Sequence, residues 1–485
     1  MSVGEDEIEL KFLCEASDAA AVLAAAPAGE DKTKDLVSTY YDTPDGALKK
    51  AGVSLRLRES AGAWVQTLKR GDGFAREEHE ALVADGRLDL SMRALAECLA
   101  PERHGALTPV FTVQVTRQQR TFAYGDAQIE MAVDQGEILG GGRRQAICEV
   151  ELELITGDCK RLFDVARQLA RTAPLYLSFE GKSSQGRALL AGAERHARKY
   201  AGVRLKPEMP ASRAFQAVVR EALSQIAANA LLLRSHDDPE AVHQLRVAVR
   251  RLRSALSTFR KVAADAEFDR LKAELKWLAK ACDEARDLDV FANDNAALAD
   301  LGPVLGAARV QAYAKATAAV ASGRFRDLVL DLTAWTETGA WLTAPALAER
   351  REQPAAKFAA KALDKRWKAL RHDGRHLDNL DDEARHEVRI EAKKLRYAAE
   401  AFASLYDAKA ADRFVSRLKK LQGVLGDLND LAVAGRLVER LEPQGAGLDA
   451  ARTLIAAREA GRADALAHAV KAMKRLRKTE PFWRD

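Results

Sequence analysis

Two acidic residues and one basic residue alternate with apolar ones near the start of the chain. Glu7, Glu9 and Lys11 are separated by Ile8 and Leu10. In an extended strand, side chains at positions i, i+2 and i+4 share one face, so the three charged groups lie together. A single strand of this kind is ordinarily a surface strand with solvated charges. If its charged face lines a cavity instead, the carboxylates can hold a hard metal cation and the ammonium can bind an anion.

The same alternation recurs in later segments and brings together charges of both signs. In chain order, these segments carry Arg56 and Arg58, Lys69, Arg76, Glu78 and Glu80, Arg117 and Arg120, Glu130 and Asp134, and Glu149, Glu151 and Glu153. Arginine and lysine bind phosphate oxygens, and carboxylates bind a divalent cation that bridges those phosphates. Many carboxylates converging without a cation would repel one another. The pattern therefore indicates a site for a phosphate chain, whereas the Gly-x-x-x-x-Gly-Lys-Ser/Thr loop of P-loop enzymes is absent from the sequence.

The elements that must position these groups are short strands. Turn signals separate them at residues 43–46, 71–73, 124–126 and 140–142. About eight strands with one apolar and one charged face predict a closed antiparallel β-barrel with a charged interior.

Six motifs, in this order, resemble the CYTH, or triphosphate tunnel metalloenzyme, superfamily. They are EIELK at 7–11, LRLR at 55–58, TLK at 67–69, REEHE at 76–80, VDQG at 133–136 and CEVELE at 148–153. The resemblance implies an eight-stranded antiparallel β tunnel, a divalent metal and hydrolysis of a triphosphate. The surroundings of Asp134 and Glu149 are most similar to those of bacterial inorganic triphosphatases.

The resemblance also implies residue roles. The catalytic residues would be Lys11, Glu7 and Glu9, with Lys11 contacting the phosphate near the scissile bond. The substrate phosphates would be bound by Arg56, Arg58, Lys69, Arg76, Arg117, Arg120 and Lys182. The metal would be held by carboxylates from Glu7, Glu9, Glu78, Asp134, Glu149, Glu151 and Glu153, with Mg²⁺ as the expected ion and Mn²⁺ as the alternative. The basic residue that the family has two positions before Arg117 is Val115 here, and Arg120 is the candidate to replace it.

The second part of the chain is helical and duplicated. Residues 238–253 align without gaps with residues 381–396 at an offset of 143, with seven identities in sixteen positions. A duplication of this kind predicts two similar helical bundles related by a pseudo-two-fold axis. The whole chain is therefore expected to be multidomain, α+β in its first part and all-α in its second. We expect a tunnel domain at 1–204, a linker at 205–211, and a helical domain at 212–485 with repeats at about 212–352 and 355–485.

Each repeat has a helix with one strongly basic face. On an α-helix, His243, Arg246, Arg250 and Arg253 fall on one side, and the aligned residues of the second repeat do the same. One such face is usually solvated, but two of them can form a continuous groove for a polyanion. The two histidines are open to either of two roles, ligand contact or packing.

These helices resemble the signature of the CHAD family, named for its histidine-containing α-helical domain. The family implies binding of inorganic polyphosphate and association with polyphosphate granules. The residues implied are His243, Arg246, Arg250, Arg251, Arg253, Arg270, His386, Arg389, Lys393, Lys394, Arg396 and Arg413.

Charge and composition fit two parts with different partners. The chain has 76 Lys and Arg against 71 Asp and Glu, of which residues 201–485 hold 50 and 40, so the second part is basic and the first is acidic. No apolar run approaches the roughly 18–20 residues of a membrane span, and no signal peptide is recognisable. The five cysteines have no metal-ligand spacing and predict reduced thiols in a cytoplasmic protein.

The sequence thus predicts metal-dependent hydrolysis of inorganic triphosphate to pyrophosphate and phosphate by a protein with a polyphosphate-binding domain. Two alternatives stay open. One is a non-catalytic or weakly catalytic polyphosphate-binding protein associated with granules, and the other is a hydrolase of an organic triphosphate such as thiamine triphosphate. Neither a membrane nor a specific nucleic acid is expected as a partner.

Overall fold

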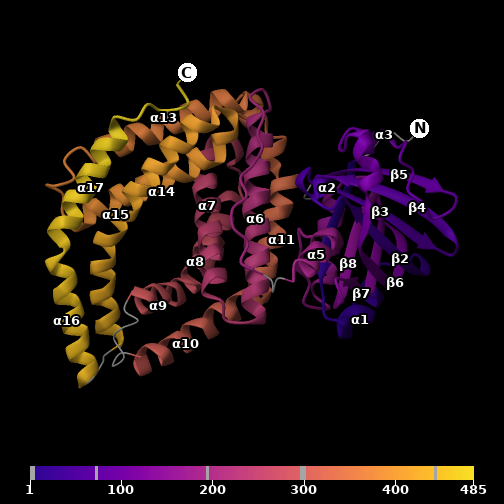
Figure 1. Cartoon of the computed structure of the whole chain (residues 1–485), viewed down its shortest axis with the longest axis horizontal. Helices are drawn as coiled ribbons and strands as arrows, with labels where there is room; N and C mark the ends of the chain where they lie inside the picture. Colours follow the sequence, from indigo (N-terminus) through magenta and orange to yellow (C-terminus); the bar gives the residue numbers. More distant parts are fainter. Residues whose placement is uncertain (1–5, 72–74, 193–195, 295–301, 442–444, 485) are drawn as a thin grey trace. The chain divides into compact units, whose positions relative to one another are not determined.

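The computed structural model describes residues 6–71, 75–192, 196–294, 302–441 and 445–484 (Figure 1). Two compact units make up these residues. The first comprises the residues up to His196 together with Val329–Ala334, and the second comprises the other residues from Ala197 onward. Within the described ranges, no helix combines the length and the apolar character needed to cross a membrane.

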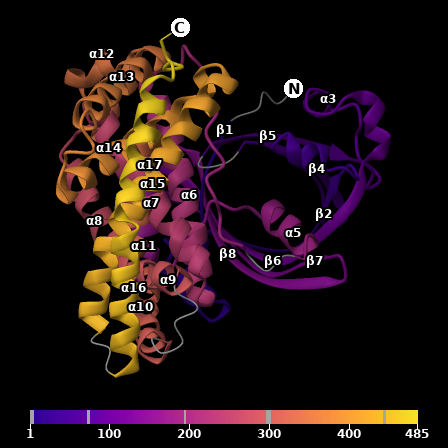
Figure 2. The same ribbon diagram turned by 60° about the vertical axis from the view of Figure 1, so that its left-hand side comes forward.

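Nine antiparallel strands are described in the first unit, and eight of them close into a barrel (Figure 2). Around the barrel the order is β1-β5-β4-β3-β2-β6-β7-β8, and β8 pairs with β1 again. The two-residue strand β9 is added to β1. The predicted eight-stranded closure is therefore confirmed, with β9 as an extra pairing. The strands are β1 (Asp6–Leu13), β2 (Glu30–Asp42), β3 (Val53–Ser60), β4 (Ala63–Arg70), β5 (Ala75–Val83), β6 (Thr108–Tyr124), β7 (Ala127–Gly140), β8 (Arg143–Thr156) and β9 (Tyr176–Leu177).

Short helices accompany the strands. They are α1 (Ala19–Ala25), α2 (Ala47–Lys50), α3 (Arg93–Ala96), α4 (Lys160–Leu169) and α5 (Lys182–Leu190).

Helix α5 lies within the ring of strands (Figure 2) and packs on the inward face of the barrel near one end. Its Leu189 and Leu190 contact a buried apolar cluster that includes Phe111 and Ile138. The approach is very close at Gly186, because a Cβ there would lie 2.2 Å from the Phe111 ring. This end of the barrel interior is therefore apolar and filled, which leaves the remainder for the charged residues.

The second unit is built from helices throughout its described residues (Figure 1). They are α6 (Ala211–Ser235), α7 (Pro239–Ala263), α8 (Phe268–Ala281), α9 (Asp283–Asp294), α10 (Gly302–Ala321), α11 (Gly323–Thr338), α12 (Ala348–Glu352), α13 (Ala355–Asp373), α14 (Asp382–Phe402), α15 (Ala408–Leu441), α16 (Ala446–Ala460) and α17 (Arg462–Arg477).

Equivalent contacts in the two halves of this unit reflect the duplication. Asp238 caps the N-terminus of α7 by accepting from the amides of Glu240 and Ala241, and Asp381, 143 residues later, caps α14 by accepting from Ala384. Both aspartates satisfy amides that have no partner within the helix.

The starts of α6 and α13 are joined to each other by reciprocal backbone hydrogen bonds. The Ala211 amide donates to the Gln353 carbonyl at 2.9 Å, and the Ala355 amide donates to the Met209 carbonyl at 2.8 Å. Such an exchange is what a two-fold relation between the repeats produces. It also shows that the segment predicted as a linker, 205–211, is bound to the helical unit, since the Leu205 amide also donates to Ser404 Oγ at 3.0 Å.

Aromatic side chains fill the core of the second unit. Phe259 of α7 stacks on Phe358 of α13 with ring centroids 4.5 Å apart and also contacts Phe402 of α14. Phe215 of α6 makes edge contacts with Trp335 and other rings. The core therefore joins helices of both repeats.

Candidate functional site

A cavity of about 230 Å³ in the barrel interior collects the charged faces of the strands. Its basic lining residues are Lys11 (β1), Arg56 and Arg58 (β3), Lys69 (β4), Arg117 (β6) and Lys182 (α5). Its acidic lining residues are Glu9 (β1), Glu78 and Glu80 (β5), Glu130 (β7), and Glu151 and Glu153 (β8).

The carboxylates and most of the cations occupy different parts of the wall, with Lys11 of β1 on the acidic side. The strands β4, β3, β2 and β6 are consecutive around the barrel, and the lining charges on them are all basic. The strands β7, β8, β1 and β5 complete the ring and carry all the lining carboxylates. Arginine on one side can hold phosphate oxygens, while carboxylates on the other side can hold a hard cation against the same phosphates.

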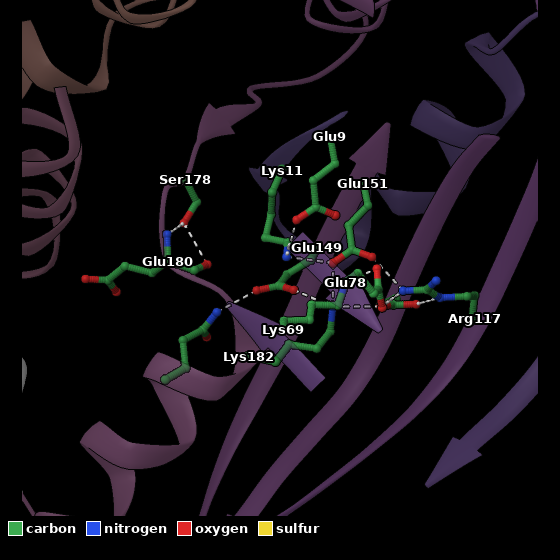
Figure 3. Close-up of polar contacts among 12 residues, drawn as sticks. Glu9, Lys11, Lys69, Glu78, Arg117, Glu149, Glu151, Ser178, Glu180 and Lys182 are labelled. Carbon is green, nitrogen blue, oxygen red and sulfur yellow. Dashed lines mark hydrogen bonds and ion pairs between the residues drawn. The ribbon is translucent and has the colours of Figure 1, made fainter. Parts of the chain in front are cut away.

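Lys182, the first residue of α5, is the centre of a buried ion network (Figure 3). Its Nζ lies 2.6 Å from Glu149 Oε2, 2.8 Å from Asp134 Oδ2 and 2.9 Å from Glu151 Oε1. Burial opposes the charge on Lys182, but the carboxylates of Asp134, Glu149 and Glu151 outweigh it and raise the lysine pKa well above its usual value. The helix N-terminus is thereby fixed to β7 and β8.

Glu151 is held by three cations. Lys11 Nζ lies 2.9 Å from its Oε1, and Arg117 Nη2 donates to its Oε2 at 2.6 Å, while the same guanidinium also binds both oxygens of Asp134 at 2.7 Å. Although burial acts to raise it, these cations and Lys182 lower the pKa of Glu151 well below its usual value. For Lys11, burial acts to lower the pKa, but Glu151 and Glu9 raise it, so the ammonium stays charged.

Arg56 and Arg58 have fewer close contacts with carboxylates than Lys182 and Arg117 have. The carboxylates of Glu78 and Glu80 lie 3.9 Å from Arg56 Nη2, and Arg56 Nε is buried without a hydrogen-bond partner in the described residues. Arg58 Nε donates to the Ser38 hydroxyl at 3.3 Å. Burial, together with the charges of Arg56 and Arg117, lowers the pKa of Arg58 to about 10. An anion in the cavity would relieve this concentration of positive charge.

Three carboxylates at paired positions across the strands are suited to a hard cation. Glu9 of β1 and Glu130 of β7 are both directly opposite Glu153 of β8, so three carboxylates form a row across three strands. Like charges directly opposite destabilise a sheet, and oxygen donors of this kind are the ligands that Mg²⁺ prefers. The donor set therefore fits the implied divalent cation. Within the described ranges, however, no three acidic, histidine or cysteine side chains are already gathered around one point.

The structure separates the predicted carboxylates into two groups. Glu9, Glu78, Glu151 and Glu153 line the cavity. Asp134 and Glu149 are completely buried outside its lining and are neutralised by basic residues. Glu149 Oε1 also accepts from Gln185 Nε2 at 2.5 Å. These two carboxylates contact the lysine and the arginine of the site, and the metal-binding role that the resemblance implies for them stays a prediction.

Arg120 does not face the cavity, contrary to the prediction that it replaces the missing basic residue. Its guanidinium binds Asp31, at 2.5 and 2.8 Å, and the carbonyl of Leu23. The reason is the period of two in a strand, because a residue three positions after Arg117 must point to the opposite face. Val115 belongs to the apolar cluster near α5.

The side chains of two predicted residues are not described. The side chains of Glu7 and Arg76 lie outside the described part of the structure, although their strands, β1 and β5, are paired with each other.

Several lining residues were not predicted. Alternation had placed Glu80 and Glu130 on charged strand faces, but neither was given a role, and both line the cavity. Tyr40 also lines the cavity, and its hydroxyl interacts with Arg56. Gln185, which positions Glu149, lies on α5 and has no sequence signal of this kind.

The basic faces of the two repeats meet in the second unit. Arg250 Nε of α7 donates to the Tyr397 hydroxyl of α14 at 3.3 Å. Burial, and then the charges of Arg389, Arg250 and Arg246, lower the pKa of Lys393 to about 7. Because these arginines come from both helices, the two faces form one cluster of positive charge rather than two separate surfaces.

The remaining predicted residues of this unit differ in surroundings. Arg251 pairs with Glu400 at 2.6 Å and lies over the Tyr200 ring, which is a packing arrangement. Lys394 pairs with Glu391 at 2.6 Å. Arg270 and Arg413 are exposed on α8 and α15 and do not share the buried environment of the cluster.

The two histidines are not equivalent. His243 is half-buried, and burial together with Arg286 lowers its pKa to about 4, so it is neutral at pH 7. His386 is exposed. Arg286 of α9, which was not predicted, therefore belongs to the surroundings of the basic cluster.

Family models match both units of the chain. A model of the CYTH domain matches residues 5–186, and a model of the CHAD domain matches residues 217–439. The inorganic triphosphatase of Haemophilus influenzae is 30% identical over 159 residues, which are 31% of this chain and only 45% of that relative. An uncharacterized protein of Mycobacterium tuberculosis is 29% identical over 458 residues, 85% of this chain and 83% of the relative.

A solved structure resembles the second unit. The crystal structure of the CHAD domain from the plant Ricinus communis is 31% identical, covers 58% of this chain and 97% of its own, and has a TM-score of 0.51. The chain therefore belongs to the CHAD family through its second unit and carries a CYTH domain in front of it.

Proposed function

We propose that the first unit hydrolyses inorganic triphosphate to pyrophosphate and phosphate with a divalent cation, and that the second unit binds inorganic polyphosphate. The observation that carries the first part is the separation of the lining arginines, on β3 and β6, from the lining carboxylates, on β7, β8, β1 and β5, around a cavity of about 230 Å³. Phosphoryl transfer depends on charge neutralisation and positioning rather than on a protein nucleophile. The similarity to an inorganic triphosphatase over the same unit supports this proposal.

The basic residues would bind and polarise the phosphate chain. Arg56 and Arg58 have hydrogen-bonding capacity left for phosphate oxygens, and Arg117 is held rigidly by Asp134. Lys11 remains protonated beside Glu151 and Glu9, so it acts as a cation on the developing charge and not as a base.

Glu9, Glu153 and Glu130 would hold the metal ion. A divalent cation there supplies charge neutralisation on the phosphates and an activated water, and Mg²⁺ is the proposed ion, with Mn²⁺ as the alternative. Glu9 also contacts Lys11, with 3.4 Å between Oε1 and Nζ, so it connects the metal-binding side with the phosphate-binding side.

The lining favours an inorganic triphosphate over an organic one. Among the described lining residues Tyr40 is the single aromatic side chain, and it is buried and engaged with Arg56. A nucleobase or a thiazolium ring needs an apolar or aromatic surface to stack on.

Phosphate release by the full-length protein tests the proposal. Triphosphate, long polyphosphate, ATP and thiamine triphosphate are compared with Mg²⁺ and then with Mn²⁺. Triphosphate is expected to be the best substrate, and Glu9→Gln is expected to lower kcat at least about 100-fold, in line with loss of an electrostatic catalytic group. Arg120→Ala is the matched control, since it removes a charge from the same barrel outside the cavity. Normal hydrolysis by Glu9→Gln would contradict the assignment, and binding of triphosphate without turnover by the unmodified protein would favour a non-catalytic binding role.

The cluster on α7 and α14 carries the proposal for the second unit. Arg253 and Arg396 each have a buried Nε without a hydrogen-bond partner in the described residues, and Lys393 lies among several arginines. A polyphosphate chain has about one charge per phosphate and would replace the missing counter-ions, so binding should weaken steeply with added salt.

Titration of the full-length protein with long polyphosphate tests this part. Arg250→Gln combined with Lys393→Gln should weaken binding at least tenfold, whereas Arg270→Gln combined with Arg413→Gln, which removes two exposed charges, should have a smaller effect. Equal losses in the two double variants, or tighter binding to single-stranded DNA, would contradict a specific site. Association with polyphosphate granules is proposed as the cellular consequence and is tested by co-sedimentation.

A further inference from the structure

Two cysteines meet at the end of the β1–β8 ladder. Leu13 of β1 is directly opposite Glu149 of β8, and the Cys14 amide then donates to the Cys148 carbonyl at 3.3 Å. Cys14 is therefore the next rung of the same antiparallel ladder. The two Sγ atoms are 3.2 Å apart, and both side chains are half-buried.

The surroundings of the pair differ from those of other thiols in the chain. Cys98 Sγ contacts the guanidinium of Arg70 and donates to the Ala94 carbonyl at 3.0 Å, and Cys282 is 1% exposed. None of the five cysteines, all of which are described, is in a disulfide. Among the described residues, a sulfur-to-sulfur contact occurs at Cys14 and Cys148.

We propose that Cys14 and Cys148 are an oxidation site, where peroxide converts the two thiols into a reversible disulfide that links β1 to β8. In the first step one thiolate attacks hydrogen peroxide, the O–O bond breaks, and a sulfenic acid and hydroxide form. In the second step the other thiol attacks the sulfenic sulfur, the S–S bond forms, and water leaves. Peroxide is reduced to water, and the two thiols are oxidised by two electrons.

The backbone already has the geometry for this bond. Opposite residues in an antiparallel pair have Cα atoms about 4.5–5.5 Å apart, which falls within the 4.4–6.8 Å range of disulfides. The sulfur atoms need to approach by only about 1.2 Å to reach the usual S–S length of about 2.0 Å. The bond can therefore form without a change of strand register.

The link would act on the two strands that carry much of the charged cavity wall. Strand β1 carries Glu9 and Lys11, and β8 carries Glu151 and Glu153. The cysteines are 134 positions apart, so the disulfide would also close a long loop and restrict the unfolded chain. In a reducing compartment such a bond is transient and reports oxidation. Oxidation is thus expected to hold β1 on β8 and to stabilise the barrel against opening.

The full-length reduced protein is treated with hydrogen peroxide, alkylated and mapped by mass spectrometry. The expected result is the loss of two titratable thiols of the five and one cross-linked peptide pair containing Cys14 and Cys148. Hydrogen exchange of the β1 and β8 amides should become slower after oxidation, and dithiothreitol should reverse both changes. This readout does not depend on any catalytic activity.

Single serine variants provide the controls. Cys14→Ser and Cys148→Ser should each prevent the cross-link, whereas Cys98→Ser should form the cross-link at the wild-type rate. Separate adducts on Cys14 and Cys148 in the unmodified protein, or unchanged exchange in the cross-linked form, would overturn the proposal.

Discussion

Replacing Lys182 by methionine tests the network that fixes α5 in the barrel. The side chain of Lys182 is 9% exposed and contacts three carboxylates at 2.6–2.9 Å. In the Lys182→Met variant, Arg117 still neutralises Asp134 and Glu151, but the described contacts of Glu149 are reduced to the hydrogen bond from Gln185. One buried negative charge therefore loses its cation.

The size of the effect follows from two independent estimates. Removing one partner of a buried ion pair costs about 3–5 kcal/mol. The variant can instead take up a proton on one carboxyl, which for a glutamic acid with an unfolded-state pKa of about 4.3 costs about 3.7 kcal/mol at pH 7. Protonation limits the penalty, so we expect the first unit to lose about 3–4 kcal/mol of unfolding free energy at pH 7.

The loss of unfolding free energy in Lys182→Met should also depend on pH in a definite direction. In the wild type, the lowered pKa values of Asp134 and Glu151 contribute stability that is present above their unfolded values and is lost as the pH falls through the folded ones. The raised pKa of Lys182 contributes stability that is present below its unfolded value and is lost as the pH rises through the folded one. In Lys182→Met the proton is easier to acquire at low pH, so the penalty relative to wild type should shrink by about 2.7 kcal/mol between pH 7 and pH 5.

The assay must report on the first unit alone. Denaturant dependence of hydrogen exchange in β7 and β8 of the full-length protein does so, at pH 7 and pH 5. The double variant Lys182→Met/Glu149→Gln also removes the buried charge that lost its cation, so it should recover most of the lost unfolding free energy. Lys32→Met, which removes one partner of an exposed ion pair, should change the unfolding free energy little. A loss below about 1 kcal/mol at pH 7, or a penalty that does not shrink at pH 5, would refute the reasoning.

Three further outcomes follow from particular contacts. Gly186→Leu should destabilise the first unit by at least about 1–3 kcal/mol and reduce phosphate release, because even a Cβ there would lie 2.2 Å from the Phe111 ring. Thermal unfolding and a phosphate-release assay of the purified variant check this. Polyphosphate affinity should fall as the pH rises through about 7, because burial and neighbouring arginines lower the pKa of Lys393 to that value and a neutral lysine no longer binds the anion. Binding titrations at several pH values check this, and Lys393→Arg should make the affinity depend less on pH. Arg117→Ala should abolish phosphate release while Arg120→Ala should leave it unchanged, and equal effects of the two would contradict the assignment of their faces.

Local periodicity in the sequence was sufficient to identify much of the cavity wall. A strand places every second side chain on one face, so Glu9 with Lys11, Arg56 with Arg58, and Glu151 with Glu153 could be grouped before any pairing was known. The same rule excludes Arg120 from the face of Arg117, as the structure shows.

The duplication of the second part could also be predicted from the sequence, because both repeats have the residues that cap the basic helices and form their basic faces. Asp238 and Asp381 both cap the basic helices, and Arg250 of the first contacts Tyr397 of the second. The different burial of His243 and His386 could not be predicted from the sequence, because aligned positions in the two repeats have different neighbours.

Only the tertiary structure decided which charged residues are available to a ligand. Lys182 is remote in sequence from β7 and β8, and the insertion of α5 into the barrel brings its ammonium to Glu149, Asp134 and Glu151. Asp134 is neutralised in this way and does not line the cavity. Glu130, on the same face of β7, does line it. The physical reason is that charge and alternation are local properties, whereas burial and neutralisation depend on elements that are distant along the chain.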